Sequence, residues 1–295
     1  MNSISQRNNE DKVKYSKELL CCLMSFFLML AYVAMSVLIV LDIGFLPGAV
    51  RQVLGSSRYY ENLQKDLYRK TETMTAPTGL SLDVIEEVFP KDEIIREVNE
   101  YISASVQGNL YRPAVDTIET RLKQKIESFL LEKEIETDPE QQRSIEEYIT
   151  SVGREYERSI GQPLLGFFCT LIRNYQRFHM RWWLTSGGFL MLSLFLLKWL
   201  KREWSGFRKY MYCSIMASAW MLLLLPGILL LKPYNAVWLY PRHLNEFVLQ
   251  YSSFLLRKLF STGMAAMLLS ILILLVGGEK SFFGKSPSPG ALSKD

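Results

Sequence analysis

The stretch LLCCLMSFFLMLAYVAMSVLIVL, Leu19–Leu41, decides the fold, because it runs for 23 residues without a charged side chain. An α-helix rises about 1.5 Å per residue, so roughly 20 apolar residues cross a hydrocarbon core of about 30 Å. Three further apolar runs follow, at Trp182–Leu197, Tyr210–Leu231 and Leu259–Gly277. The sequence therefore predicts a polytopic membrane protein with four transmembrane helices.

The segment between the first two runs is long and acidic. Residues 48–165 include 22 Asp and Glu but only 15 Lys and Arg, although the whole chain has a net charge of +4. Basic residues of short loops stay on the cytoplasmic side of a membrane, whereas long domains are translocated largely regardless of charge. The N-terminal tail, the link between runs two and three and the C-terminal tail are the basic short segments. We therefore expect cytoplasmic N- and C-termini, and an insert on the extracytoplasmic side of a cell membrane.

These patterns predict nine segments. The expected segments are a cytoplasmic tail at 1–18, a transmembrane helix at 19–41, an extracytoplasmic helical domain at 42–181, a transmembrane helix at 182–200, a cytoplasmic link at 201–209, a transmembrane helix at 210–231, an extracytoplasmic loop with an interfacial amphipathic helix at 232–258, a transmembrane helix at 259–277 and a disordered cytoplasmic tail at 278–295. Neither an Asn-x-Ser/Thr sequon nor a cysteine pair within the insert is present, which favours a bacterial source.

The insert is predicted to be an all-α bundle. Apolar residues recur at helical spacing in several stretches, such as Ile94, Val98 and Ile102, and no alternating strand pattern occurs. Ser81 is expected to cap a short helix that extends to Phe89. Three further helix limits are expected: Gly108 as a helix end, Asp138 as an N-cap, and Pro163 at the start of a helix that continues into the second apolar run.

Within the apolar runs the small residues are spaced for helix packing. Ser214 and Ser218 are four residues apart, as are Ala266 and Ser270. Small residues at this spacing allow membrane helices to approach closely. No ionisable residue lies deep in a predicted span, which weighs against a proton-coupled pump.

No constellation of catalytic residues is evident. The chain has only two histidines, His179 and His243, and neither has the spacing of a metal ligand. We interpret each as a histidine at a helix interface. The acids at Glu132, Glu134, Glu136, Asp138 and Glu140 are interpreted as a solvated corner with an N-cap. We therefore expect a non-enzymatic protein without catalytic residues, metal or cofactor.

Two groups of basic residues are candidate contact sites. The outer group is expected to bind lipid headgroups or to dock the acidic domain, and both alternatives remain open. The inner group is expected to contact a cytoplasmic partner. The outer group comprises Arg173, Arg177, Arg181, Arg257 and Lys258, and the inner group comprises Lys201, Arg202, Arg208 and Lys209.

The leading hypothesis is a scaffold or sensor whose extracytoplasmic helical domain binds a protein partner or an envelope component. The lipid bilayer is a further expected partner, and nucleic acid is not. As an alternative, the order of one span, a large insert and three more spans resembles that of MacB/FtsX-type permeases, which implies a permease-like subunit driven by a separate cytoplasmic ATPase. The resemblance is one of layout and length, so no residues are carried over. A third hypothesis is a membrane enzyme that uses the outer arginines on lipid substrates.

Overall fold

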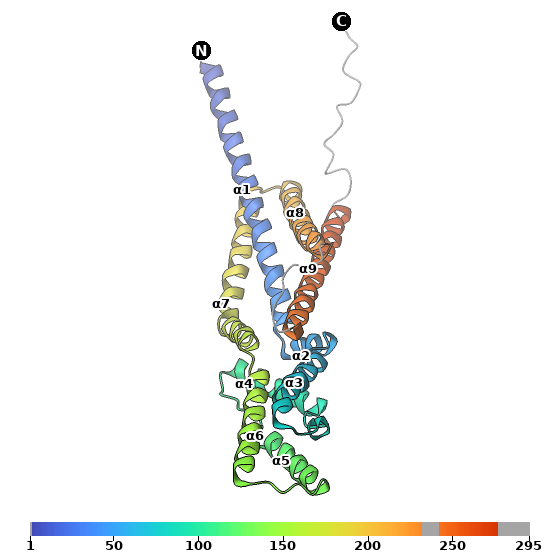
Figure 1. Cartoon of the computed structure of the whole chain (residues 1–295). Coiled ribbons are helices and arrows are strands. Elements are labelled where there is room, and N and C mark those ends of the chain that lie inside the picture. Colours follow the sequence, from blue (N-terminus) through green and yellow to red (C-terminus); the bar gives the residue numbers. More distant parts are fainter. Residues whose placement is uncertain (1, 232–241, 277–295) are drawn as a thin grey trace. The chain divides into compact units, whose positions relative to one another are not determined.

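The computed structural model of the chain describes the backbone of residues 2–231 and 242–276, and the side chains of residues 15–231 and 243–275. Within these ranges every regular element is helical, which confirms the all-α prediction for them. The α-helices (Figure 1) are α1 (Asn2–Gly44), α2 (Pro47–Ser56), α3 (Tyr59–Thr75), α4 (Lys91–Gln107), α5 (Val115–Glu132), α6 (Pro139–Ile160), α7 (Pro163–Leu200), α8 (Trp204–Leu231) and α9 (Arg242–Val276). Two 3-10 helices, η1 (Ala76–Thr78) and η2 (Leu82–Ile85), lie between α3 and α4.

Within the described residues, four helical stretches are long and apolar enough to cross a membrane. They are Tyr15–Gly44, Pro139–Leu200, Trp204–Leu231 and His243–Leu275. The second stretch joins α6 to α7, and its long apolar segment lies in α7. The prediction of four membrane-spanning helices is therefore confirmed at the level of helix length and composition, which indicates a multi-pass membrane protein.

The helices extend beyond the predicted spans. α1 begins at Asn2, so the predicted tail at 1–18 is helical from its second residue. α9 is a single helix from Arg242 to Val276, whereas the sequence analysis separated an interfacial helix within 232–258 from a span at 259–277. The two parts are continuous because neither glycine nor proline interrupts the helical pattern between them, and the interfacial position of the first part stays a prediction. The predicted disordered tail at 278–295 and the loop residues 232–241 lie outside the described residues.

The chain divides into two compact units. The span unit comprises Met1–Gly44, His179–Pro233 and Ser253–Asp295, and the insert unit comprises Phe45–Phe178 and Tyr234–Ser252. The insert unit therefore contains most of the predicted domain at 42–181. It also includes the first turns of α9, which the sequence analysis assigned to a separate loop.

In the span unit, small side chains lie between the helices. The hydroxyls of Ser25 on α1 and Ser214 on α8 are 2.7 Å apart, and Ser218 donates a hydrogen bond of 3.2 Å to the carbonyl oxygen of Met29. Ala266 on α9 is fully buried against Ile215 and Ala219 of α8. The predicted role of the small residues in helix packing is confirmed at these positions.

In the insert unit, large apolar side chains fill the core. Each of α3, α4, α5 and α6 buries one stripe, and the stripes of α4, α5 and α6 are those that the sequence predicts. The fully or almost fully buried members include Leu63, Leu67, Ile94, Val98, Ile102, Ile118, Leu122, Ile126, Val152 and Ile160. α6 also contacts α5 closely at Gly153, where an added Cβ would lie 2.7 Å from Cγ1 of Val115. Burial of these stripes against one another stabilises the bundle.

Three of the four predicted helix limits agree with the structure. Asp138 caps α6 through a hydrogen bond of 2.7 Å from the backbone N–H of Gln141, whose side chain in turn accepts from the Asp138 N–H. Gly108 ends α4 in the left-handed conformation, with φ of 85°, and Pro163 begins α7. The exception is Ser81, which caps only the 3-10 helix Leu82–Ile85, because the backbone becomes extended at Glu86, with ψ of 138°, and Glu87 then adopts a positive φ of 58°.

Candidate functional site

The three outer arginines of α7 share one helix face. Arg173, Arg177 and Arg181 are four residues apart on a continuous helix, and all three are exposed. Nη1 of Arg173 lies 3.0 Å from the position that a Cβ on Gly108 would occupy. The guanidinium therefore stands at the C-terminal end of α4, where the last carbonyls and the helix dipole favour a cation. This contact favours the docking alternative for Arg173.

The two outer basic residues of α9 are also exposed. Arg257 and Lys258 lie in the span unit, and Nζ of Lys258 is 5.6 Å from the ring centroid of Phe254. A contact of this length is within the range of a cation–π interaction. It holds the Lys258 ammonium beside an aromatic ring of its own helix.

The inner basic residues surround a tight turn between α7 and α8. Only residues 201–203 separate the two helices. Nζ of Lys201 is 5.4 Å from the ring centroid of Tyr210, and Arg202 is exposed. Arg208 and Lys209 are half-buried on the first two turns of α8. The structure thus gathers the four predicted residues of this group at one end of the span unit.

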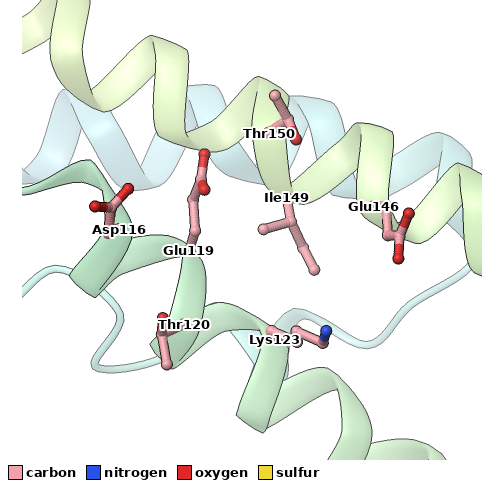
Figure 2. A pocket seen from close by; sticks show the side chains of 7 residues that line it. All are labelled: Asp116, Glu119, Thr120, Lys123, Glu146, Ile149 and Thr150. Carbon is pink, nitrogen blue, oxygen red and sulfur yellow. The ribbon is translucent and has the colours of Figure 1, made fainter.

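A shallow groove of about 420 Å³ lies between α5 and α6 (Figure 2). Four of its side chains come from α5 and three from α6: Asp116, Glu119, Thr120, Lys123, Glu146, Ile149 and Thr150. It is open, and six of its seven lining residues are polar. Three acids and one lysine line it, so a positively charged surface fits it better than a negatively charged one. Among the described residues, no group of three or more His, Cys, Asp and Glu side chains is arranged to hold a metal ion.

The turn after α5 exposes two large aliphatic side chains. The backbone N–H of Ile135 donates to the Leu130 carbonyl at 3.0 Å, and that of Glu134 donates to Leu131 at 3.2 Å. This is the Schellman arrangement that ends a helix, with Glu134 in the left-handed region at φ of 53°. Leu131 is 79% exposed and Ile135 is 47% exposed. We call residues 131–138 the hairpin tip.

A buried charge network joins α4 to the segment before α5, and the sequence analysis missed it. Glu97 is only 2% exposed, and it accepts hydrogen bonds from the Tyr111 hydroxyl at 2.6 Å and from the backbone N–H of Ala114 at 3.1 Å. Burial, and then the Glu97 carboxylate, raises the pKa of the Tyr111 phenol, which keeps it a donor. The available signal was that Glu97 lies three residues after Ile94, on the buried face of α4.

A second polar cluster lies where α9 begins. His243 is 1% exposed and its ring stacks edge-on against Tyr59 of α3, with centroids 5.1 Å apart. The side-chain amide of Asn62 donates to Glu246 at 2.6 Å. Nε2 of His243 and the Tyr59 hydroxyl are buried without a hydrogen-bond partner among the described residues. The expectation of a histidine at a helix interface is confirmed for His243, whereas His179 is exposed.

The class that these features define is an all-helical, multi-pass membrane protein with a separate helical unit inserted after its first long helix. The chain matches no family model, no curated protein and no solved structure in the three comparisons made with known proteins. Any functional conclusion therefore rests on the residues and contacts described above.

Proposed function

We propose that the chain is a non-enzymatic membrane protein whose insert unit lies on the extracytoplasmic side and binds a protein partner or an envelope component there. The observation that carries this proposal is the hairpin tip, which exposes two aliphatic side chains only four residues apart, Leu131 and Ile135, whereas the other exposed leucines of the unit, such as Leu82 and Leu110, stand singly. Covering a large aliphatic side chain is worth about 1.5–3 kcal/mol. A partner seated on the tip would gain that stabilisation.

The charge of the hairpin tip specifies the chemistry of the partner. Five acids lie within or just after the tip: Glu132, Glu134, Glu136, Asp138 and Glu140. The groove between α5 and α6 adds further carboxylates on the same hairpin (Figure 2). Opposite charges steer partners together and discriminate against like-charged surfaces. The expected partner surface is therefore apolar at its centre and basic at its rim.

The extracytoplasmic position of the insert unit is supported by the basic short segments. The link after α7 and the first turns of α8 contain Lys201, Arg202, Arg208 and Lys209, and the N-terminal region before the first apolar run is also basic. Both would be retained in the cytoplasm, and one helix of membrane length separates each of them from the insert unit. The proposed orientation follows from these two segments together.

Photo-crosslinking of the full-length protein in its membrane tests the proposal. A photoreactive residue at Ile135 is expected to give one defined cross-linked product. Leu131→Asp should weaken binding by roughly 10- to 100-fold, because this change in affinity corresponds to the free energy gained when an exposed leucine side chain becomes buried. The matched control is Leu110→Asp, because Leu110 is 101% exposed on the same unit but lies before α5. Equal loss of the product in both variants, or no product at all, would contradict the proposal.

The permease alternative is favoured by one observation, the order of the four helices of membrane length around the insert unit. It requires a cytoplasmic ATPase. Purification of the tagged native complex in mild detergent, followed by mass spectrometry, separates the two functions. A stoichiometric ATPase supports the permease, whereas an extracytoplasmic partner without an ATPase supports the scaffold or sensor.

A further inference from the structure

The turn between α7 and α8 has to lie at a membrane surface. α7 ends at Leu200 and α8 begins at Trp204, and both belong to stretches that are apolar enough to span a membrane. A link of three residues reaches about 10 Å when extended, much less than the roughly 30 Å of a hydrocarbon core. The turn and the adjoining helix ends therefore lie at the level of the lipid headgroups, whichever side of the membrane they face.

Two tryptophans at this turn have the exposure of interfacial residues. Trp199 is 67% exposed at the end of α7, and Trp204 is 60% exposed at the start of α8. Tryptophan is enriched at headgroup level because its ring is apolar and its N–H needs a polar partner. A lipid surface accommodates both parts of each side chain.

The lysines of the turn are held by aromatic rings. Nζ of Lys198 is 4.6 Å from the ring centroid of Trp204 and 5.5 Å from that of Phe207. Lys201 folds back over α8, with its Cδ 3.5 Å from the place of a Cβ on Gly206 and its Nζ 5.4 Å from the Tyr210 ring centroid. These cation–π contacts limit the freedom of both ammonium groups. Less entropy is then lost when an anion binds them.

The positive charge of the turn exceeds its own negative charge. Between residues 198 and 209 the chain has five basic side chains and one acid, Glu203. Arg202 is exposed, and Nε of Arg208 is buried without a hydrogen-bond partner among the described residues. Guanidinium groups match the geometry of phosphate oxygens. The turn therefore combines aromatic anchors with cations that suit a phosphate.

We propose that the α7–α8 turn binds the phosphate of an anionic phospholipid headgroup. Lys201, Arg202 and Arg208 supply the positive charge, while Trp199 and Trp204 lie beside the lipid at the interface. The headgroup level of the turn favours a lipid over a soluble protein, because headgroups surround this position in every state of the molecule. The binding site is separate from the hairpin tip, and its test does not depend on the proposed function.

Lipid selectivity of the full-length protein tests this site. The protein is reconstituted in phosphatidylcholine vesicles with spin-labelled phosphatidylglycerol or phosphatidylcholine, and the relative association constant is measured. The site variant is Lys201→Gln, Arg202→Gln and Arg208→Gln together. Each basic residue near an anionic membrane strengthens binding by about fivefold. Loss of three such residues should therefore lower the preference for phosphatidylglycerol by at most about 100-fold.

A control variant with the same loss of charge is available on the insert unit. It replaces three exposed basic residues with glutamine: Lys65, Arg112 and Arg154. Its preference for phosphatidylglycerol should equal that of the unmodified protein. Arg202→Gln alone changes one exposed side chain and should reduce the preference by up to about fivefold without affecting folding.

Two results would overturn the proposal. If the site variant kept its preference for phosphatidylglycerol, the basic residues of the turn would serve another ligand, such as a cytoplasmic protein. If the site and control variants lost the preference equally, net charge alone would account for it. Raising the ionic strength should weaken the preference of the unmodified protein, because salt screens exposed charges.

Discussion

The span unit and the insert unit are both helical, but their helices meet through different side chains. In the insert unit, leucine and isoleucine stripes such as Leu63, Ile94 and Leu122 are fully buried. In the span unit, Ser214, Ser218 and other small residues lie between the helices, and many large apolar side chains point outward, although Leu28, Leu197 and Phe207 are buried in one cluster. Trp220 and Leu225 of α8, for example, are 48% and 56% exposed.

The difference is the one expected between helices that pack in water and helices that pack in lipid. Water drives large apolar side chains into a core, so a unit in water is stabilised by burying them. Lipid is as apolar as leucine, so helices in a membrane are held by close approach and by hydrogen bonds between them. The two units therefore require different tests of what stabilises them.

The largest expected effect is a core truncation in the insert unit. Leu122→Ala removes a fully buried side chain of α5 and should lower the free energy of unfolding of that unit by about 2–5 kcal/mol, the range for a leucine that leaves a cavity. Denaturant unfolding of the full-length protein in mild detergent measures it. Leu110→Ala, at a fully exposed position, should have no measurable effect.

A glycine substitution tests close approach in the span unit. A Cβ on Gly263 of α9 would lie 3.0 Å from the backbone carbon of Leu222 on α8, so Gly263→Val should separate the helices and cost about 1–3 kcal/mol. Gly187→Val is the control, since an added Cβ there meets no atom within 4 Å. Resistance to unfolding by dodecyl sulfate reports both. Equal loss in the two variants would mean that helix approach does not stabilise this unit.

A glycine substitution at the helix end in the hairpin tip should stabilise the insert unit. Glu134 has a φ of 53°, which costs a residue with a side chain about 1–2 kcal/mol, so Glu134→Gly should stabilise the insert unit by roughly 1 kcal/mol. Glu127→Gly, at an exposed position inside α5, should instead destabilise it by about 0.5–1 kcal/mol. Thermal unfolding of both variants distinguishes a conformational effect from the loss of an acid, because each removes one glutamate.

The smallest effect is expected for the hydrogen bond between α1 and α8. A double-mutant cycle of Ser25→Ala and Ser214→Ala should give a coupling of about 0.6 kcal/mol, the average for such pairs between membrane helices. The pair is measured by unfolding in dodecyl sulfate. A coupling near zero would mean that the small size of these side chains, and not the hydrogen bond between them, stabilises this contact.

Much of the fold could be predicted because its signals are local. The buried stripes of α4, α5 and α6, the cap at Asp138 and the glycine end at Gly108 depend on residues within one helix. The α5–α6 hairpin tip was interpreted only as a solvated corner, since the exposure of Leu131 and Ile135 depends on which other elements cover them. The gathering of the inner basic residues was predictable, because they are close in sequence.

The sequence by itself determined the four helices of membrane length, the helical insert and the positions of its main caps. Hydrophobic run length and helical periodicity encode these features, and each is read within a single segment. Only the tertiary structure decided that Ser25 meets Ser214, that Glu97 is buried beside Tyr111 and that His243 lies against Tyr59. No pair lies within a single helix, and two of the pairs join residues far apart in the chain. Their energies depend on which faces meet, and no pattern within one helix contains that information.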